Sequence, residues 1–198
     1  MNGKTIITVF DYGAGNMHSL LKALDIGGDV EVRLQTDPEA ALETDALILP
    51  GVGAFSNAAG RLASGAPAMR DAILGGLPTL CICLGMQLLF DDSEEGPGTG
   101  LGVIPGHVRR LRAKRIPQIG WNEVESLDEA LPQVAYFANS YVCEPDDADC
   151  ITAYTTHERD RFASVVTVVN TVGVQFHPEK SSRAGVSFVR DFVNGVIR

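Results

Sequence analysis

The stretch Thr79-Leu80-Cys81-Ile82-Cys83-Leu84-Gly85-Met86-Gln87 decides the fold. Its first four residues are apolar or β-branched, which is typical of a strand that is buried on both faces. Residues 84–90 have helical character and follow this strand without a gap. A buried strand that leads directly into a helix has the geometry of a nucleophile elbow, a sharp turn that exposes one side chain. We therefore expect an α/β fold with Cys83 at the turn.

Upstream of this stretch, short buried strands alternate with helices. Three strands are predicted from apolar, β-branched runs: residues 5–10, 30–34 and 46–49. Asn16 is predicted to cap a helix with an apolar stripe, which consists of Met17, Leu20, Leu21 and Leu24. A second helical stretch, residues 56–75, is interrupted near residues 65–67. This alternation predicts a doubly wound, mostly parallel sheet of flavodoxin-like type.

Downstream, the pattern changes to two β-rich runs, residues 162–169 and 172–176, which are joined at Asn170-Thr171. Two such runs around a short polar turn predict an antiparallel hairpin. A helix follows, with one apolar face made of Val186, Val189, Val193 and Val196. With 198 residues and no linker or repeat, we expect one domain over residues 1–198, with a C-terminal β-hairpin region.

The composition of the chain excludes several classes of function. Hydrophobic residues make up 45% of it, which excludes disorder as the main state. The formal charge of -9 disfavours nucleic acid as a partner. Every apolar run is too short for a signal peptide or a membrane helix, so we expect a cytoplasmic protein with no membrane partner.

Cysteine spacing and a basic cluster bear on ligands. The four cysteines, Cys81, Cys83, Cys143 and Cys150, lack the spacing of a zinc site, so we expect no metal and no cofactor. Disulfides are not expected in the cytoplasm. The basic cluster consists of Arg109, Arg110, Arg112, Lys114 and Arg115. It is either a solvated strand and loop face or a contact surface for a partner or an anionic ligand.

Cys83 is the candidate nucleophile. Gly85 suits a sharp turn, and backbone N–H groups at the start of the following helix would stabilise a thiolate and could hold an oxyanion. Cys81 lies one pleat back inside the strand, where a thiol behaves as a small, inert hydrophobe. The alternative at either position is an ordinary buried core cysteine.

His177 is the candidate general base. It follows the predicted strand, Pro178 ends that strand, and strand ends of such sheets are where ligands bind. Glu179 could accept a hydrogen bond from the far ring nitrogen and fix the tautomer. The other histidines, His18, His107 and His157, are predicted to be structural or solvated. A cysteine at an elbow together with a His-x-Glu sequence predicts acyl transfer through a thioester.

These residues resemble those of class I glutamine amidotransferases and, within that family, the glutaminase subunits of imidazole glycerol phosphate synthases. The resemblance covers nearly the whole chain and rests on five segments: residues 10–16 (FDYGAGN), 50–55 (PGVGAF), 83–87 (CLGMQ), 120–122 (GWN) and 173–181 (GVQFHPEKS). Most sister amidotransferases have a Gly-Gly-Pro type of sequence in the second segment. The Lys180-Ser181 ending of the last segment is specific to this branch.

The resemblance implies roles for individual residues. It implies a triad of Cys83, His177 and Glu179, with an oxyanion hole from backbone N–H groups of Gly51, Val52, Gly53 and Leu84. It assigns L-glutamine binding to Gln87, Glu95, Asn139, Ser140 and Tyr141. It places Trp121 and Asn16 at the interface with a partner.

The resemblance also implies a partner chain. A cyclase barrel needs ~250 residues, which this chain does not have beyond its amidotransferase domain. The implied partner is therefore a separate (β/α)8 cyclase subunit, bound as a heterodimer, which uses the ammonia to form imidazole glycerol phosphate and an aminoimidazole carboxamide ribotide.

Three residues depart from the family's pattern. Cys81 stands where Gly is usual, and Gln118 and Asn139 stand where His is common. None of them belongs to the implied triad. Two other classes of function remain open at this point, a free-standing thiol hydrolase or peptidase of similar fold and a catalytically silent binding subunit.

Overall fold

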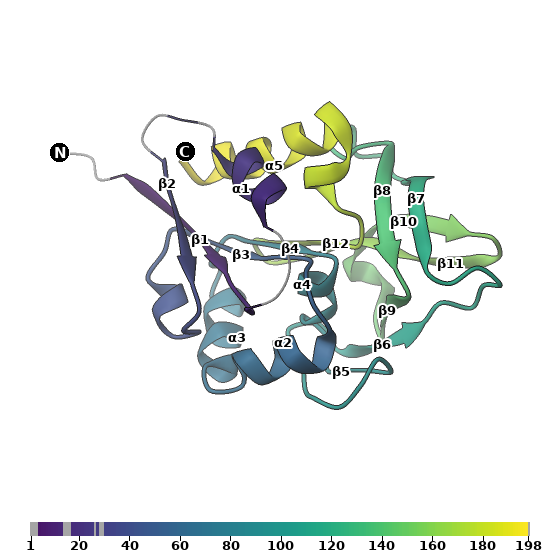
Figure 1. The fold of residues 1–198 in the computed structure, drawn as a ribbon, viewed down its shortest axis with the longest axis horizontal. Coiled ribbons are helices and arrows are strands. Elements are labelled where there is room, and N and C mark those ends of the chain that lie inside the picture. Colours follow the sequence, from purple (N-terminus) through teal and green to yellow (C-terminus); the bar gives the residue numbers. More distant parts are fainter. Residues whose placement is uncertain (1–3, 14–16, 26, 28–29, 198) are drawn as a thin grey trace.

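The computed structural model describes residues 4–13, 17–25, 27 and 30–197. Within this part of the chain, one sheet of seven strands forms the centre of the molecule, in the order β10-β11-β12-β4-β3-β1-β2 (Figure 1). The strands are β1 (Thr5–Phe10), β2 (Val30–Gln35), β3 (Ala46–Leu49), β4 (Thr79–Ile82), β10 (Ile151–His157), β11 (Asp160–Val168) and β12 (Thr171–Val174). The run from β12 to β2 is parallel, whereas β10, β11 and β12 pair antiparallel.

Helices cover both faces of this sheet (Figure 1). The helices α1 (His18–Leu24) and α5 (Ser182–Ile197) lie on one face, and α2 (Phe55–Leu62) and α3 (Ala66–Leu74) lie on the other. Strand side chains alternate between the two faces: Cys81 belongs to the core on the α2 and α3 side, and Ile82 to the core on the α1 and α5 side. Cys83 follows the end of β4 and belongs to the same core as Ile82. Burial on both faces explains why β3 and β4 are continuous apolar or β-branched runs, whereas the edge strand β2 alternates and is partly exposed.

Two smaller sheets lie beyond the β10–β11 edge (Figure 1). The described residues form a sheet of β5 (Asp92–Ser93), β6 (Gly106–Arg110) and β9 (Tyr141–Pro145), and a two-stranded sheet of β7 (Gln118–Glu123) and β8 (Val134–Asn139). Short 3-10 helices occur at Ala40–Leu42, Ala148–Cys150 and Pro178–Lys180. The small sheets bring Glu95 and residues 138–141 beside Cys83, which follows β4.

The predicted α/β class and the mostly parallel sheet are confirmed, as is the hairpin, whose turn contains Val169 and Asn170. The predicted helix at 56–75 is two helices, α2 and α3, with the break where it was expected. Asn16, predicted as a helix cap, lies outside the described residues, and α1 has Met17 at its N-cap position.

The helix predicted at 84–90 is shorter than expected, since α4 spans only Leu84–Gln87. The next carbonyl groups are taken by the loop that follows: Leu101 N–H donates to the Leu88 carbonyl at 2.7 Å, and Ile104 N–H donates to that of Leu89 at 3.0 Å. Gly100 is needed for this contact, because a Cβ there would overlap the Phe90 carbonyl oxygen. The loop therefore replaces the second helical turn that the apolar pattern predicted.

Candidate active site

Cys83 occupies a strained turn between β4 and α4. Its φ of 48° and ψ of -101° are unfavourable for a residue with a side chain, and its N–H donates to the Val174 carbonyl at 2.7 Å. Gly85 makes the turn possible, because a Cβ at this position would overlap the Leu49 carbonyl oxygen. The side chain of Cys83 is 8% exposed, whereas that of Cys81 is fully buried. The two thiols therefore differ in access, as the sequence predicted.

His177 and Glu179 follow β12 and form a closely held pair. His177 Nδ1 lies 2.9 Å from Glu179 Oε1, and the backbone of His177 is fixed by two further hydrogen bonds. Its N–H donates to the Tyr136 carbonyl at 2.8 Å, and its carbonyl accepts from Ser181 Oγ at 2.7 Å. The second oxygen of Glu179, Oε2, is buried and has no hydrogen-bond partner among the described residues.

Opposing effects set the pKa of His177. Burial by itself lowers it, but the adjacent Cys83 and the Glu179 carboxylate outweigh burial and raise the pKa of His177 to about 10. This shift requires an anionic environment around the ring, so His177 carries its proton whenever the Cys83 sulfur is a thiolate. Burial alone raises the pKa of Cys81, which keeps that thiol neutral.

Gly51 lies between Cys83 and His177. A Cβ at Gly51 would come within 2.8 Å of Cys83 Cβ and 3.0 Å of His177 Cε1, so no larger residue fits there without displacement. Gly53, two residues on, has a φ of 103°, a conformation that L side chains rarely adopt. The loop predicted to carry the oxyanion hole is thus in direct contact with both groups.

A cavity of about 190 Å³ opens beside Cys83. It is lined by Gly51, Gly53, Cys83, Leu84, Gln87, Glu95, Ala138, Asn139, Ser140 and Tyr141. All five residues that the resemblance assigned to glutamine are in this set. Of the predicted site residues, Val52, His177 and Glu179 are outside the lining, and Ala138 is an addition that the sequence did not predict.

Contacts within the cavity wall fix two of its polar side chains. Glu95 Oε2 accepts a hydrogen bond from the Phe55 N–H at 2.8 Å, which joins the loop that contains Glu95 to the start of α2. Asn139 Nδ2 donates to the Tyr141 carbonyl at 3.1 Å, and its buried Oδ1 has no partner within the described part of the chain. The cavity wall therefore contains a carboxylate held by a backbone N–H and an amide whose oxygen is buried.

Gln175 belongs to the site but was not assigned a role from the sequence. It is fully buried, and its Nε2 lies 3.4 Å from Cys83 Sγ. The available signal was an amide between the apolar residues Val174 and Phe176 at the end of a core strand. Its partner is 92 residues away in sequence, so spacing alone could not reveal the contact.

An apolar surface adjoins the cavity on the outer face of β7 and β8. We call it the Trp121 patch, and it consists of Ile119, Trp121, Val134, Tyr136 and Ala138. Trp121 is 55% exposed and packs edge-to-face on Tyr136, with ring centroids 6.2 Å apart. Ala138 is shared between this patch and the cavity wall. Asn16, the other predicted interface residue, is outside the described residues.

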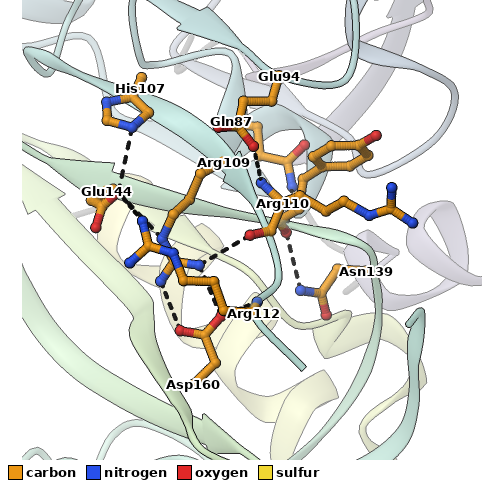
Figure 2. Close-up of polar contacts among 10 residues, drawn as sticks. Gln87, Glu94, His107, Arg109, Arg110, Arg112, Asn139, Glu144 and Asp160 are labelled. Carbon is orange, nitrogen blue, oxygen red and sulfur yellow. Dashed lines mark hydrogen bonds and ion pairs between the residues drawn. The ribbon is translucent and has the colours of Figure 1, made fainter. Parts of the chain in front are cut away.

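The basic cluster combines a buried residue with exposed ones, so neither interpretation describes it fully. Arg109 is buried, and its guanidinium donates to both oxygens of Asp160 at 2.8 Å, with Glu144 3.2 Å from Nε (Figure 2). Figure 2 also shows Arg112 beside this pair; its N–H donates to Asp160 at 2.7 Å. Arg115 is exposed and forms an ion pair with Glu158.

No group of three His, Cys, Asp or Glu side chains within the described ranges could hold a metal ion. The helices described here are all too short or too polar to cross a membrane. The four cysteines are free thiols.

The site combines a cysteine at an elbow, a His-Glu pair and a small polar cavity. The family model of class-I glutamine amidotransferases matches residues 8–196. The chain therefore belongs to the class-I glutamine amidotransferases.

Curated relatives narrow this assignment. The chain is 40% identical over 205 residues to the imidazole glycerol phosphate synthase subunit HisH of Gloeothece citriformis, with 96% of each chain covered. It is 42% identical over 206 residues to the subunit of the same name from Synechocystis, again with 96% of each chain covered. Within the class, the chain is a member of the HisH family.

Solved structures agree with the fold. A glutamine amidotransferase structure superposes with a TM-score of 0.72 at 19% identity, covering 97% of this chain and 99% of that one. The structure of PurLQS from Thermotoga maritima gives a TM-score of 0.68 at 18% identity, covering 98% of this chain and 100% of the matched chain.

Proposed function

We propose that this chain is the glutamine-hydrolysing subunit of an imidazole glycerol phosphate synthase in histidine biosynthesis. It converts L-glutamine to glutamate and ammonia, and a separate cyclase subunit consumes the ammonia. The observation that carries this proposal is the convergence of Cys83, His177 and Glu179 beside a cavity lined by the residues that the resemblance assigned to glutamine. Membership of the HisH family supports the same reaction.

The reaction proceeds in two steps on the Cys83 sulfur. The thiolate attacks the side-chain amide carbon of glutamine, and the resulting tetrahedral intermediate expels ammonia, which takes its proton from His177. The neutral His177 then removes a proton from water, which attacks the thioester, releases glutamate and regenerates the thiolate. Glu179 acts through His177, because its Oε1 holds Nδ1 and leaves the other ring nitrogen for the reaction.

Backbone N–H groups supply the oxyanion hole in this proposal. The resemblance assigns it to Gly51, Val52, Gly53 and Leu84, and three of these, Gly51, Gly53 and Leu84, line the cavity beside Cys83. The conformational freedom of Gly51 and Gly53 allows a peptide in this loop to turn either a carbonyl or an N–H toward Cys83. Only the second orientation stabilises the oxyanion, so the loop could act as a switch that is closed until a partner binds.

The polar groups of the cavity suit the α-carbon end of glutamine. The carboxylate of Glu95 is an acceptor for the α-ammonium group, and Asn139 lines the same cavity. Gln87, Ser140 and Tyr141 complete the contacts to the α-amino and α-carboxylate groups. The cavity is smaller than the sites that bind drug-sized ligands, as expected for one amino acid.

We propose that the (β/α)8 cyclase docks on the Trp121 patch. Exposed aromatic and aliphatic side chains next to a cavity are typical of a protein interface, and Ala138 makes this surface continuous with the cavity. Docking there would enclose the ammonia, which in water at neutral pH is mostly protonated and no longer nucleophilic. A cytoplasmic location is part of the same proposal, because reducing conditions there would keep the four free thiols reduced.

Steady-state glutamate production tests both the activity and the switch. Rates are measured for the chain alone, with the cyclase subunit, and with the cyclase and its nucleotide substrate. The expected order is a low rate, a higher rate and the highest rate, because the loss of one oxyanion donor typically lowers turnover roughly 10²–10³-fold. Equal rates in all three samples would contradict the switch. A free-standing hydrolase or peptidase would instead be fully active alone, and a silent binding subunit would be inactive in every sample.

The docking surface is tested with a matched pair of variants. Trp121→Ala is expected to weaken cyclase binding by about 2 kcal/mol or more, as truncation of a central interface aromatic does. Leu127→Ala removes another exposed apolar side chain, which lies outside the patch, and is expected to leave binding unchanged. Titration calorimetry with the cyclase distinguishes them, and equal losses in both variants would place the interface elsewhere.

A further inference from the structure

The mechanism above leaves one polar side chain next to the reacting sulfur without a role. Gln175 follows β12 and extends its amide toward Cys83, with Nε2 3.4 Å from Sγ. Its Oε1 lies 3.3 Å from Gln87 Nε2, and Gln87 lines the glutamine cavity. Gln175 therefore connects the nucleophile to the wall of the substrate site.

Neighbouring groups fix the orientation of the Gln175 amide. The Tyr141 carbonyl can only accept hydrogen bonds, so the Gln87 atom 3.2 Å from it must be the amide nitrogen (Figure 2 shows Gln87 and its contact). That nitrogen has a second hydrogen, which it donates to Gln175, so Gln175 must present its oxygen there. The amide nitrogen of Gln175 is then directed at the sulfur. Gln87 is held by a backbone carbonyl, which makes this orientation independent of side-chain motion at Cys83.

We propose that Gln175 is a catalytic residue whose amide N–H donates to the Cys83 thiolate and holds the sulfur in position for attack. The inference rests on the proposed role of Cys83 as nucleophile. It adds a donor to the sulfur besides the groups of the triad. No covalent change occurs at Gln175 during the reaction.

The chemistry of sulfur explains why an amide is suited to this position. A neutral thiol is a weak acceptor, so a buried amide that faces it gains little for the loss of hydration. A thiolate is a full negative charge, and hydrogen bonds to charged groups are about twice as strong as neutral ones. The contact thus favours the reactive form of Cys83. An apolar side chain would pack as well beside Val174 and Phe176 but would give the thiolate no donor.

The test measures how fast Cys83 is alkylated by iodoacetamide as a function of pH, in the full chain, with the modified residue identified by mass spectrometry. Gln175→Met keeps the length of the side chain and removes the donor. The expected result is an upward shift of about one to two pH units in the midpoint of the profile, since a hydrogen bond to a charged group corresponds to about a 10- to 100-fold change in equilibrium. The value of kcat/KM for glutamine with the cyclase is expected to fall by a similar factor.

Gln118→Met is the matched control. Gln118 is likewise a buried amide, 4% exposed, and its side chain has no hydrogen-bond partner among the residues described. Its substitution makes the same chemical change at an amide that has no hydrogen bond to Cys83, and the alkylation midpoint is expected to stay at the wild-type value. If Gln175→Met does not fold, Gln175→Glu preserves the shape, and its carboxylate is expected to move the midpoint upward further.

An alkylation profile in the folded Gln175 variant that matches wild type would overturn the inference, and would leave the triad untouched. A failure of the proposed function has a different signature, because the wild-type chain would then release no glutamate with the cyclase, or Cys83→Ala would release it as fast as wild type. Equal shifts in Gln175→Met and Gln118→Met would also overturn the inference, since they would indicate a general loosening of the core.

Discussion

Two buried carboxylates in this molecule have very different surroundings. Asp160 accepts three hydrogen bonds, two from the Arg109 guanidinium and one from the Arg112 N–H, and both of its oxygens are used. Glu179 holds His177 with one oxygen, and its other oxygen has no partner among the described residues. Buried polar groups are normally satisfied, and the unused oxygen of Glu179 is consistent with its proposed place beside a group whose charge changes during the reaction. The saturated Asp160 marks a site that only has to stay assembled.

The two clusters also differ in what they connect. Arg109 and Asp160 join β6 to β11, two strands of different sheets. His177 and Glu179 are two residues apart in one short segment, and their partner Cys83 comes from a neighbouring strand end. The comparison predicts that changes in the Glu179 cluster reduce activity and spare stability, and that changes in the Asp160 cluster do the reverse.

The largest expected effect is on the nucleophile. Cys83→Ala is expected to reduce glutamine hydrolysis by roughly 10⁴-fold or more, because no other group can form the thioester. The free energy of unfolding is expected to stay the same or to rise. Alanine keeps the strained backbone of the turn but removes the thiol, and removal of a functional group from an active site is usually neutral or stabilising. The measurements are glutamate production and urea denaturation.

Cys81→Ala is the control for the nucleophile. It removes a thiol two residues away on the other face of the sheet, and most activity is expected to remain. A glutamine-analogue electrophile is expected to label Cys83 alone. Labelling at Cys81 would contradict the assignment of Cys83 as the nucleophile.

The second expected effect concerns the base and its orienting carboxylate. His177→Ala is expected to lose about 10²–10⁴-fold in turnover, the usual contribution of a general acid or base. Glu179→Gln is expected to lose less, because it acts only through His177. The double variant His177→Ala/Glu179→Gln is expected to be no worse than His177→Ala alone. Losses that multiply would mean that Glu179 contributes by another route.

The third expected effect is on stability. Asp160→Ala leaves the buried Arg109 guanidinium without its main partner, and is expected to lower the free energy of unfolding by about 3 kcal/mol. Glu144→Ala removes a half-exposed carboxylate from the same guanidinium and is expected to change it by at most about 1 kcal/mol. Urea denaturation gives both values. The folded Asp160→Ala protein is expected to retain most of its kcat, and a large loss of kcat would break the division between the two clusters.

The smallest expected effects are on pH dependence: the alkaline limb of activity for the Glu179 cluster and the acid limb of stability for the Asp160 cluster. The proton on His177 is needed for the departing ammonia, so activity is expected to be lost as the pH rises through the His177 pKa of about 10. Glu179→Gln removes a charge that raises this pKa, so the alkaline loss is expected at lower pH. Profiles of kcat/KM for the two proteins test this, and superimposable alkaline limbs would contradict it.

Asp160 is expected to make stability depend on pH in the acid range. Burial would raise its pKa, but the Arg109 guanidinium and the Arg112 N–H outweigh burial and lower it. Its contribution to stability is therefore complete above the unfolded value near pH 4 and is lost as the pH falls through the lower folded value. The difference in unfolding free energy between wild type and Asp160→Asn should shrink over this range. A constant difference down to pH 2 would show that the carboxylate is not the source.

Local sequence patterns predicted six of the seven strands of the central sheet, the elbow and the His-x-Glu segment, because each of these is contiguous and strongly apolar or sharply punctuated. The edge strand β10 was not predicted. The segment from β6 to β9 had no such pattern. Its strands are short and partly exposed, and β6 contains three basic or imidazole side chains in five residues. Arg109 is buried only because Asp160 meets it from 51 residues away, which no local pattern encodes.

The substrate residues and Gln175 illustrate the same limit. Asn139 and Tyr141 were predicted only through resemblance to a family, since nothing in their own segment indicates a cavity. Gln175 stood in a quoted motif but received no role, because its partner Cys83 becomes a neighbour only when β12 pairs with β4. The helix predicted at 84–90 was too long because distant loop donors took its carbonyl groups.

Cys81 and Cys83 belong to different core clusters, so labelling of their two thiols can be used to follow folding. During refolding, Cys81 loses access to a thiol reagent when β4 is covered by α2 and α3, whereas Cys83 retains access through the elbow. Pulses of reagent at increasing times would therefore record the closing of one layer against a reference thiol two residues away. The ratio of the two labels compares two thiols of the same molecule in the same pulse. A fall in the labelling of Cys81 relative to Cys83 would therefore report when α2 and α3 pack on the sheet.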